Sequence, residues 1–343
     1  CTGVRLSKEK ISKGNLSLIG VVFGATIITF IITRVVPTRP ELLWAGPHAT
    51  LEQIERARKI LHLDDPIYIQ LGYYLRDLLT GNWGVSWRTK SPVLPGILSA
   101  LPATLELIIV AFIIAMAVGI PLGIIAALRR GTLIDHILRV ITVIGASAPV
   151  FWLALISQLV FSGWLRALPS AKRIDELLVI ETGFHPITGF YLLDSLIQGN
   201  IPAFIDALRH IILPAIVLSF YPMCLSARMT RALMIEVLNE WHIRTALAWG
   251  LPKRTVLYRY ALKNVIAPVV ASLGLSFGYT IIGAFMVELV FVWPGIGMYA
   301  AMSLLSFDYP AVVGCVLFIA IFYSLINTIV DIIHAIIDPR VKL

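Results

Sequence analysis

Charged side chains are scarce in this sequence. Only 14% of its 343 residues are Asp, Glu, Lys or Arg, whereas 58% are hydrophobic and the mean hydropathy is +0.86. Soluble domains average roughly 25% charged residues, so this shortage excludes a water-soluble fold. The net charge of +8 does not indicate nucleic acid as a partner, because basic residues in a membrane protein mark the orientation of its loops.

The sequence also lacks the motifs of nucleotide and metal chemistry. No G-x-x-x-x-G-K-[ST] loop occurs, so energy for transport would have to come from another subunit or an ion gradient. No H-E-x-x-H motif occurs and the seven histidines are scattered, so we expect no metal site. Of three cysteines, Cys224 and Cys315 lie in apolar runs where a disulfide framework has no use. No signal precedes Cys1, so we expect a trimmed start rather than a lipid-modified cysteine.

Long apolar runs are what the sequence has in abundance. Each approaches the ~20 residues that cross ~30 Å of hydrocarbon. They lie at residues 16–36, 104–128, 137–161, 211–229, 267–291 and 311–337. Six spans place both termini on one side, and Lys and Arg in the connections of that side make it cytoplasmic. We therefore predict an all-α membrane protein with six transmembrane helices and both termini in the cytoplasm.

The segments between these runs suggest an organisation in three parts. We expect a cytoplasmic tail with the first transmembrane helix, a long external segment, and a core of five transmembrane helices. The core would include an external cap and a cytoplasmic loop between the fourth and fifth spans. The respective residues are 1–37, 38–103 and 104–343, with the cap at about 163–210 and the loop at about 228–266.

The external segment carries signals for two helices. Thr50 and Gln53 have the spacing of a capping box, which predicts a helix over residues 51–61. A second helix is expected to begin at Pro66 and to end before Gly81.

The cytoplasmic loop is the most informative stretch. Ile243, Ala246, Leu247 and Gly250 recur at helical spacing, and Pro252 ends the pattern. We expect this short helix to have no core of its own to join and to expose small residues, among them Ala246. Such a helix can enter a groove on an acidic partner. The alternative is an amphipathic helix that touches only lipid headgroups.

Several strings in this chain resemble one family when taken in order. "IRTALAWG" followed by "YALKNVIAP" is similar to the coupling segment of ATP-binding-cassette importer permeases of the dipeptide and oligopeptide type. The other matching strings are "GNWGVSW" through "LPATLEL", "GIPLGIIAALRRG", "SAPVFWLALI", "LRHIILPAI", "VELVFVWPGIG", "DYPAV" and "DPR". The resemblance extends over about residues 81–340.

The resemblance implies roles for individual residues of the coupling segment. Arg244, Thr245 and Ala246 occupy its Glu-Ala-Ala-like positions, Gly250 is the motif glycine, and Pro268 is the closing proline. Trp249 stands where such permeases often have Lys or another polar residue. The residues expected to dock on the ATPase are Glu240, Arg244, Thr245, Ala246, Trp249, Gly250 and Pro268.

The resemblance also implies partners. They are a second, homologous permease subunit, two cytoplasmic ATP-binding subunits and an external substrate-binding protein, in the plasma membrane of a bacterium or archaeon. This chain would be a transport subunit without enzymatic activity or cofactor, because ATP and magnesium would be bound by the ATPase subunits. Peptide is the leading substrate, and oligosaccharides or nickel are alternatives within the same family.

Polar residues within the apolar runs are candidates for a pathway lining or for interhelical hydrogen bonds. They are Gln158, Ser276, Tyr279, Thr280, Ser324 and Asn327. Residues 274–278 match G-x-S-x-G, but a nucleophile elbow needs a strand-to-helix turn, so we expect packing or pathway lining there rather than hydrolysis. Glu106 is expected in the first turn of its helix, and Glu288 is expected to snorkel to the outer interface.

An ion-coupled secondary carrier is the competing class of function. It would require charged groups at mid-depth and internally repeated, broken helices. The sequence has no convincing repeat and no carboxylate at mid-depth, which favours the ATP-driven importer.

Overall fold

The computed structural model describes residues 20, 23–31, 39–46 and 48–337, and almost all of its regular structure is helical. An isolated antiparallel bridge between Val85 and Pro92 is the one β contact that the described residues make. For these residues the all-α prediction is confirmed. The predicted tail and much of the first span lie outside the described part, although residues 23–30 are helical.

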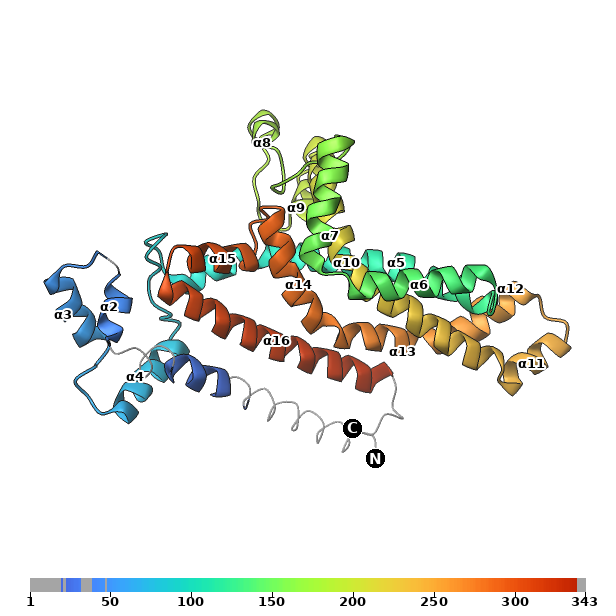
Figure 1. Cartoon of the computed structure of the whole chain (residues 1–343), viewed down its shortest axis with the longest axis horizontal. Coiled ribbons are helices and arrows are strands. Elements are labelled where there is room, and N and C mark those ends of the chain that lie inside the picture. Colours follow the sequence, from blue (N-terminus) through green and yellow to red (C-terminus); the bar gives the residue numbers. More distant parts are fainter. Residues whose placement is uncertain (1–19, 21–22, 32–38, 47, 338–343) are drawn as a thin grey trace. The chain divides into compact units, whose positions relative to one another are not determined.

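The chain forms two compact units, which are described separately. Unit 1 consists of Cys1–Leu101 and Gly295–Ile332 with Leu343, and unit 2 of Pro102–Pro294 with Ile333–Lys342. The helices of unit 1 are α2 (Pro40–Ala45), α3 (Leu51–Ile60), α4 (Ile67–Leu79), the start of α5 (Val93–Leu128), α15 (Ile296–Leu305) and most of α16 (Tyr309–Ile337), as labelled in Figure 1.

Both helices predicted between residues 51 and 81 are confirmed. The capping box of α3 is complete, because the Gln53 backbone N–H donates to the Thr50 hydroxyl at 3.3 Å and the Thr50 backbone N–H donates to the Gln53 side chain at 2.9 Å. The helix expected between Pro66 and Gly81 is α4.

A buried carboxylate organises the core of unit 1. Asp308, just before α16, accepts hydrogen bonds from the Ser86 hydroxyl and from the backbone N–H groups of Trp87 at 3.1 Å and Arg88 at 3.2 Å. An apolar cluster from α5, α15 and α16 accompanies these contacts in the same unit. The strings "GNWGVSW" and "DYPAV" therefore meet in the folded chain although about 220 residues separate them.

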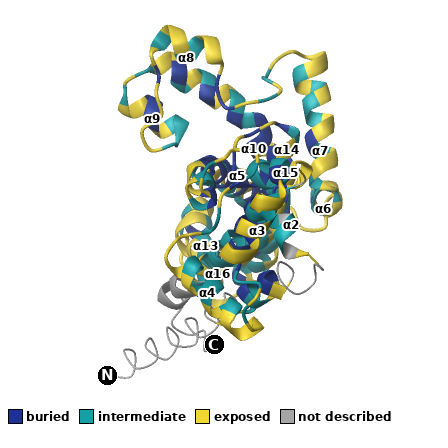
Figure 2. Ribbon diagram, turned by 90° about the vertical axis from the view of Figure 1, so that its left-hand side faces the viewer, coloured by how far each residue is buried: buried dark blue, intermediate teal, exposed yellow. Residues whose placement is uncertain are grey.

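Unit 2 holds the remaining helices, with α10 at its centre. α10 packs against α6, α7, α9, α13 and α14, and half of the α7 residues are exposed (Figure 2). The elements are α6 (Leu133–Ser147), α7 (Val150–Ser157), the π-helical η2 (Gln158–Trp164), α8 (Glu176–Thr182), α9 (Tyr191–Ile197), α10 (Ile201–Leu238), α11 (Trp241–Ala248), α12 (Lys253–Thr255), the π-helical η3 (Val256–Ala261), α13 (Leu262–Leu275) and α14 (Phe277–Val290).

The described residues contain three helices long and apolar enough to span a membrane, or up to five spans if two bent pairs are counted. The expected third run is broken between α6 and α7 by a bend of 103°, visible in Figure 1. Pro149 explains this break, because proline disfavours helical backbone at the residue before it, and Ala148 is extended with ψ 131°. The expected fifth run is bent by 53° at Ser276, between α13 and α14.

The second expected run is longer than its apolar pattern indicates. α5 begins at Val93, eleven positions before residue 104, and continues through Pro102 and Pro121. Glu106 therefore lies in the body of α5, and the expectation of a first-turn acid is wrong. Pro95 is compatible with this earlier start, because it lies in the first turn, where its missing N–H has no helical partner to lose.

Glycines bring α5 and α10 unusually close. A Cβ added to Gly119 would lie 2.6 Å from the Met223 carbonyl oxygen, and one added to Gly123 would lie 2.6 Å from the Ala227 carbonyl oxygen. The two glycines are four residues apart and so share one face of α5. Small residues at this spacing let two helix backbones approach each other.

Candidate functional site: the α11 helix and the cap segment

The helix predicted in the 228–266 loop exists as α11, and it is anchored by a core. Ile243 is fully buried and Ala246 is 6% exposed. Both belong to an apolar cluster with residues from the ends of α5 and α10, from η3 and from α13. The expectations that this helix has no core to join and that Ala246 is exposed are therefore wrong. A force on α11 would reach α10 and α13 through this packing.

The opposite face of α11 is open. Arg244 and Thr245 are exposed there, and tryptophans stand at both ends of the helix: Trp241 is 82% exposed and Trp249 is 81% exposed. The Thr245 hydroxyl donates to the Trp241 carbonyl at 2.9 Å, so it is satisfied within the helix. Large exposed aromatic side chains are the residues that most often anchor protein interfaces. Trp241 is not among the residues that the resemblance implied for docking.

Glu240 and Gly250 define the two ends of α11. Glu240 is the N-cap residue, and its carboxylate lies 2.9 Å from His242 Nδ1. Gly250 has φ +77°, and its backbone N–H donates to the Leu247 carbonyl at 3.0 Å. Glycine enters this left-handed region without strain, which explains its place after the helix end. Pro268 lies farther on, exposed and inside α13.

A second contact near α11 ties α6 to α10. Arg231 donates to Asp135 through Nε at 2.6 Å and through Nη2 at 2.9 Å, and Asp135 also accepts from the Gly131 backbone N–H at 3.0 Å. Asp135 is only 1% exposed. A bidentate pair of this kind fixes orientation as well as distance.

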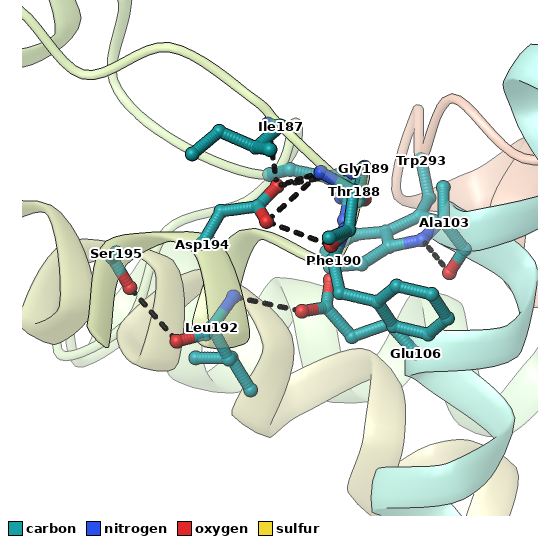
Figure 3. Close-up of polar contacts among 11 residues, drawn as sticks. Ala103, Glu106, Ile187, Thr188, Gly189, Phe190, Leu192, Asp194, Ser195 and Trp293 are labelled. Carbon is teal, nitrogen blue, oxygen red and sulfur yellow. Dashed lines mark hydrogen bonds and ion pairs between the residues drawn. The ribbon is translucent and has the colours of Figure 1, made fainter. Parts of the chain in front are cut away.

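The cap segment, residues 163–210, is anchored on α5 by a buried ion pair. Arg173 donates to Glu106. The other Glu106 oxygen accepts from the Leu192 backbone N–H at 2.8 Å (Figure 3). The Arg173 guanidinium also lies 3.7 Å from the Tyr191 ring centroid and 5.3 Å from that of Trp293. Since 67 residues separate Glu106 from Arg173, no local pattern could pair them.

Asp194 closes the turn that precedes α9. Its carboxylate accepts from the backbone N–H groups of Ile187, Thr188 and Gly189 at 3.0 Å each and from the Thr188 hydroxyl at 2.7 Å (Figure 3). Burial raises the pKa of Asp194, but these hydrogen bonds outweigh it and hold the pKa below its usual range.

Glu288 does not snorkel as expected. Its side chain is fully buried in unit 2 and accepts a hydrogen bond from the Thr104 hydroxyl at 2.6 Å. The hydroxyl and the carboxylate belong to α5 and α14, so this contact joins two apolar helices.

The predicted pathway residues fall into both units. Ser324 and Asn327 belong to α16 in unit 1, and the other four belong to unit 2. The Ser276 hydroxyl donates to the Leu273 carbonyl and the Thr280 hydroxyl donates to the Ser276 carbonyl, so both are satisfied close to the bend. Of the four in unit 2, Tyr279 is clearly exposed, at 69%, next to Tyr221. Gln158 instead bonds the Ser170 carbonyl at 2.6 Å.

Comparison with known proteins identifies the family. Residues 119–343 match the model of the binding-protein-dependent transport system inner membrane component, and residues 11–108 match the N-terminal model of the same membrane component. The chain belongs to this family. It is therefore a membrane transport subunit of a system that works with a separate binding protein.

Curated relatives match the chain over nearly its whole length. It is 42% identical over 324 residues to the probable D,D-dipeptide transport system permease protein DdpB of Escherichia coli, which covers 94% of each chain. It is 40% identical over 326 residues to the di/tripeptide transport system permease protein DppB of Pseudomonas aeruginosa, with 95% and 96% coverage. The dipeptide transport system permease protein DppB of Alkalihalophilus pseudofirmus is 38% identical over 330 residues, with 95% and 97% coverage.

Proposed function

We propose that this chain is the membrane-spanning permease of an ATP-driven importer that passes di- and oligopeptides from an external binding protein into the cell. The similarity to three peptide permeases over at least 94% of the chain carries this proposal. The relatives compared above are all named for peptides, which favours peptide over the oligosaccharide and nickel alternatives.

The proposed topology has six spans with both termini in the cytoplasm of a bacterial cell. α5, the α6–α7 pair, α10, the α13–α14 pair and α16 supply five of them, and the run at residues 16–36 supplies the first. The cap segment then lies outside, where a binding protein releases substrate. The 228–266 loop lies inside, where ATP is hydrolysed.

The proposed coupling surface is the open face of α11. Its aromatic ends, Trp241 and Trp249, enter the surface of an ATPase subunit, while Ile243 and Ala246 transmit the movement to α10 and α13. Two conformations of the membrane helices then alternate with ATP binding, each favoured by one state of the ATPases. A second permease subunit supplies the other half of the pathway, and two ATPase subunits bind ATP and magnesium.

The proposed pathway runs along the bend between α13 and α14. A break in a membrane helix is tolerated where it is buried in protein or lines a water-filled cavity. Tyr279 is exposed beside this break and is well placed to contact a peptide.

The test replaces both tryptophans of α11 with alanine in the tagged full-length chain. The variant Trp241→Ala/Trp249→Ala is expected to lose the co-purifying ATPase and at least about 90% of dipeptide uptake, because hot-spot aromatics carry most of an interface's free energy. Trp164→Ala, also strongly exposed but at the end of η2, is the matched control and keeps both. Full ATPase capture by the double variant would contradict the coupling assignment. Uptake of a disaccharide instead of a labelled dipeptide would contradict the substrate.

A further inference from the structure

Unit 1 contains a cavity that neither the coupling surface nor the pathway uses. Its volume is about 150 Å³, and it lies between α2–α4, the loop at residues 82–84 and the first turns of α16. Protein interiors have few voids larger than a water molecule, which occupies roughly 30 Å³. This space is therefore large enough for a small organic group.

Aromatic side chains form much of the wall. Trp44, Tyr74, Trp83 and Tyr309 line it together with aliphatic residues. The Trp83 indole N–H donates to the Leu78 carbonyl at 3.2 Å, and its ring packs edge-on against Phe318, so this wall is held in place from behind. An aromatic ring attracts a cation that lies over its face, so a wall rich in rings can favour a cation.

The formally charged part of the wall is negative. Asp77 and Asn82 line the cavity, and no Lys, Arg or His does. Asp77 and Tyr74 are three residues apart on α4 and share a face. The neighbouring Arg76 already contacts this carboxylate, because its Nη2 lies 3.4 Å from Asp77 Oδ1, and its guanidinium also lies 4.9 Å from the Tyr73 ring centroid. The Arg76 side chain is itself exposed and does not line the cavity.

The second carboxylate oxygen of Asp77 has no hydrogen-bond partner among the described residues. A carboxylate next to aromatic rings favours a cation over an anion, and an ammonium group would share Asp77 with Arg76. The aliphatic remainder of the wall suits a short alkyl chain. The amide oxygen of Asn82 is a second acceptor to which an ammonium N–H can donate.

We propose that this cavity binds a primary ammonium group attached to a short alkyl chain, with Asp77 as its counter-ion and Trp44, Tyr74 and Trp83 as its aromatic wall. The group has two possible sources, the ethanolamine headgroup of a phospholipid or a soluble amine. Either source leaves the binding chemistry the same. This inference does not depend on peptide import, since none of its residues belongs to the proposed coupling surface or pathway.

The experiment uses the full-length chain in phosphatidylglycerol nanodiscs. Bound lipid is counted by native mass spectrometry after adding phosphatidylethanolamine or, as the matched control without N–H donors, phosphatidylcholine. In a second arm, n-butylammonium chloride is titrated and the shift of the thermal unfolding midpoint is measured, since a ligand of the folded state raises it. Asp77→Asn removes the charge at nearly constant shape. Glu55→Gln removes an exposed carboxylate of α3 outside the cavity.

If the ammonium group comes from a lipid, the chain should retain phosphatidylethanolamine in preference to phosphatidylcholine. Asp77→Asn should reduce this retention roughly tenfold, and Glu55→Gln should not reduce it. If the ammonium group comes from a soluble amine, n-butylammonium should raise the thermal unfolding midpoint while the two lipids bind equally. Asp77→Asn should abolish this rise. Trp44→Leu is the second variant and is expected to weaken binding about threefold or more. The proposal would be overturned by equal binding of both headgroups together with no shift by n-butylammonium, or by binding that Asp77→Asn does not reduce.

Discussion

At the scale of single residues, carboxylates that accept several hydrogen bonds hold the long loops of this transport subunit. Asp308 binds the loop before α5, Asp194 binds the turn before α9, and Glu106 binds both a guanidinium and a backbone N–H group. All three carboxylates are at least 96% buried. A buried charge is costly unless it is fully hydrogen-bonded, so each of these contacts should be sensitive to removal of one partner.

Replacing Asp194 with asparagine should destabilise the chain by about 2 kcal/mol at neutral pH, because hydrogen bonds to a charged acceptor are the stronger kind. The pKa of Asp194 is lowered in the folded state, so its stabilisation is complete above the unfolded value of roughly 3.9 and is lost as the pH falls through the folded pKa. The difference between wild type and Asp194→Asn should therefore shrink in acid. Unfolding midpoints in detergent across this pH range measure it. Glu181→Gln, exposed at the end of α8, is the control, and an equal effect there would contradict the assignment.

Replacing Arg173 with methionine should cost about 3–5 kcal/mol, because Glu106 would remain buried without its counter-ion. The double variant Glu106→Gln/Arg173→Met should recover much of this loss, since the amide oxygen of Gln can still accept from the Leu192 N–H. Unfolding of wild type, both single variants and the double variant forms a thermodynamic cycle. Strictly additive losses would show that the two side chains do not act as a pair.

At the scale of the elements, glycine and proline determine where the long helices meet and where they break. Pro149 separates α6 from α7, whereas Pro102, Pro121, Pro214 and Pro222 lie within continuous helices. Glycine allows the crossing of α5 over α10. Proline therefore separates two helices at position 149 but is accommodated inside α5 and α10.

Adding a methyl group at Gly123 should destabilise the α5–α10 crossing. The new Cβ would lie 2.6 Å from the Ala227 carbonyl oxygen and from the Thr230 Cβ, so backbone would have to move. Gly123→Ala should cost about 1–3 kcal/mol, as overpacked cores generally do. Gly72→Ala in the exposed middle of α4 meets nothing within 4 Å and should be neutral or slightly stabilising. Equal unfolding midpoints for the two variants would contradict a close crossing.

The sequence was sufficient to predict that these helices form. It did not show where α5 begins or which residues of α11 face the core. The capping box at Thr50 is a local interaction between residues three apart, so its pattern predicted α3 correctly. The start of α5 and the burial of Ala246 depend on neighbours distant in the chain. Spacing alone placed Ala246 on a helix, but only the cluster with α10, η3 and α13 shows that it faces inward.

At the scale of the whole molecule, the proposed import mechanism predicts a source of energy. In proteoliposomes containing the chain, its partner subunits and the external binding protein, uptake of a labelled dipeptide should require ATP on the ATPase side. A protonophore should leave uptake unchanged, because an ABC-type pathway is driven by ATP-dependent closure of the partner subunits. Uptake that continues without ATP and stops with the protonophore would instead identify an ion-coupled carrier.

Composition and local patterns were sufficient for the class of protein. Apolar runs require helices in a membrane because backbone groups have no water to bond there, and ordered short motifs pointed to the permease family that the comparisons then showed. Contacts between distant residues needed the folded chain: the Glu106–Arg173 pair, the Asp308 loop anchor, the burial of Glu288 and the outward face of α11. Such contacts follow from three-dimensional packing, since hydropathy and spacing specify that a residue lies in a helix but not which partner it meets across the core.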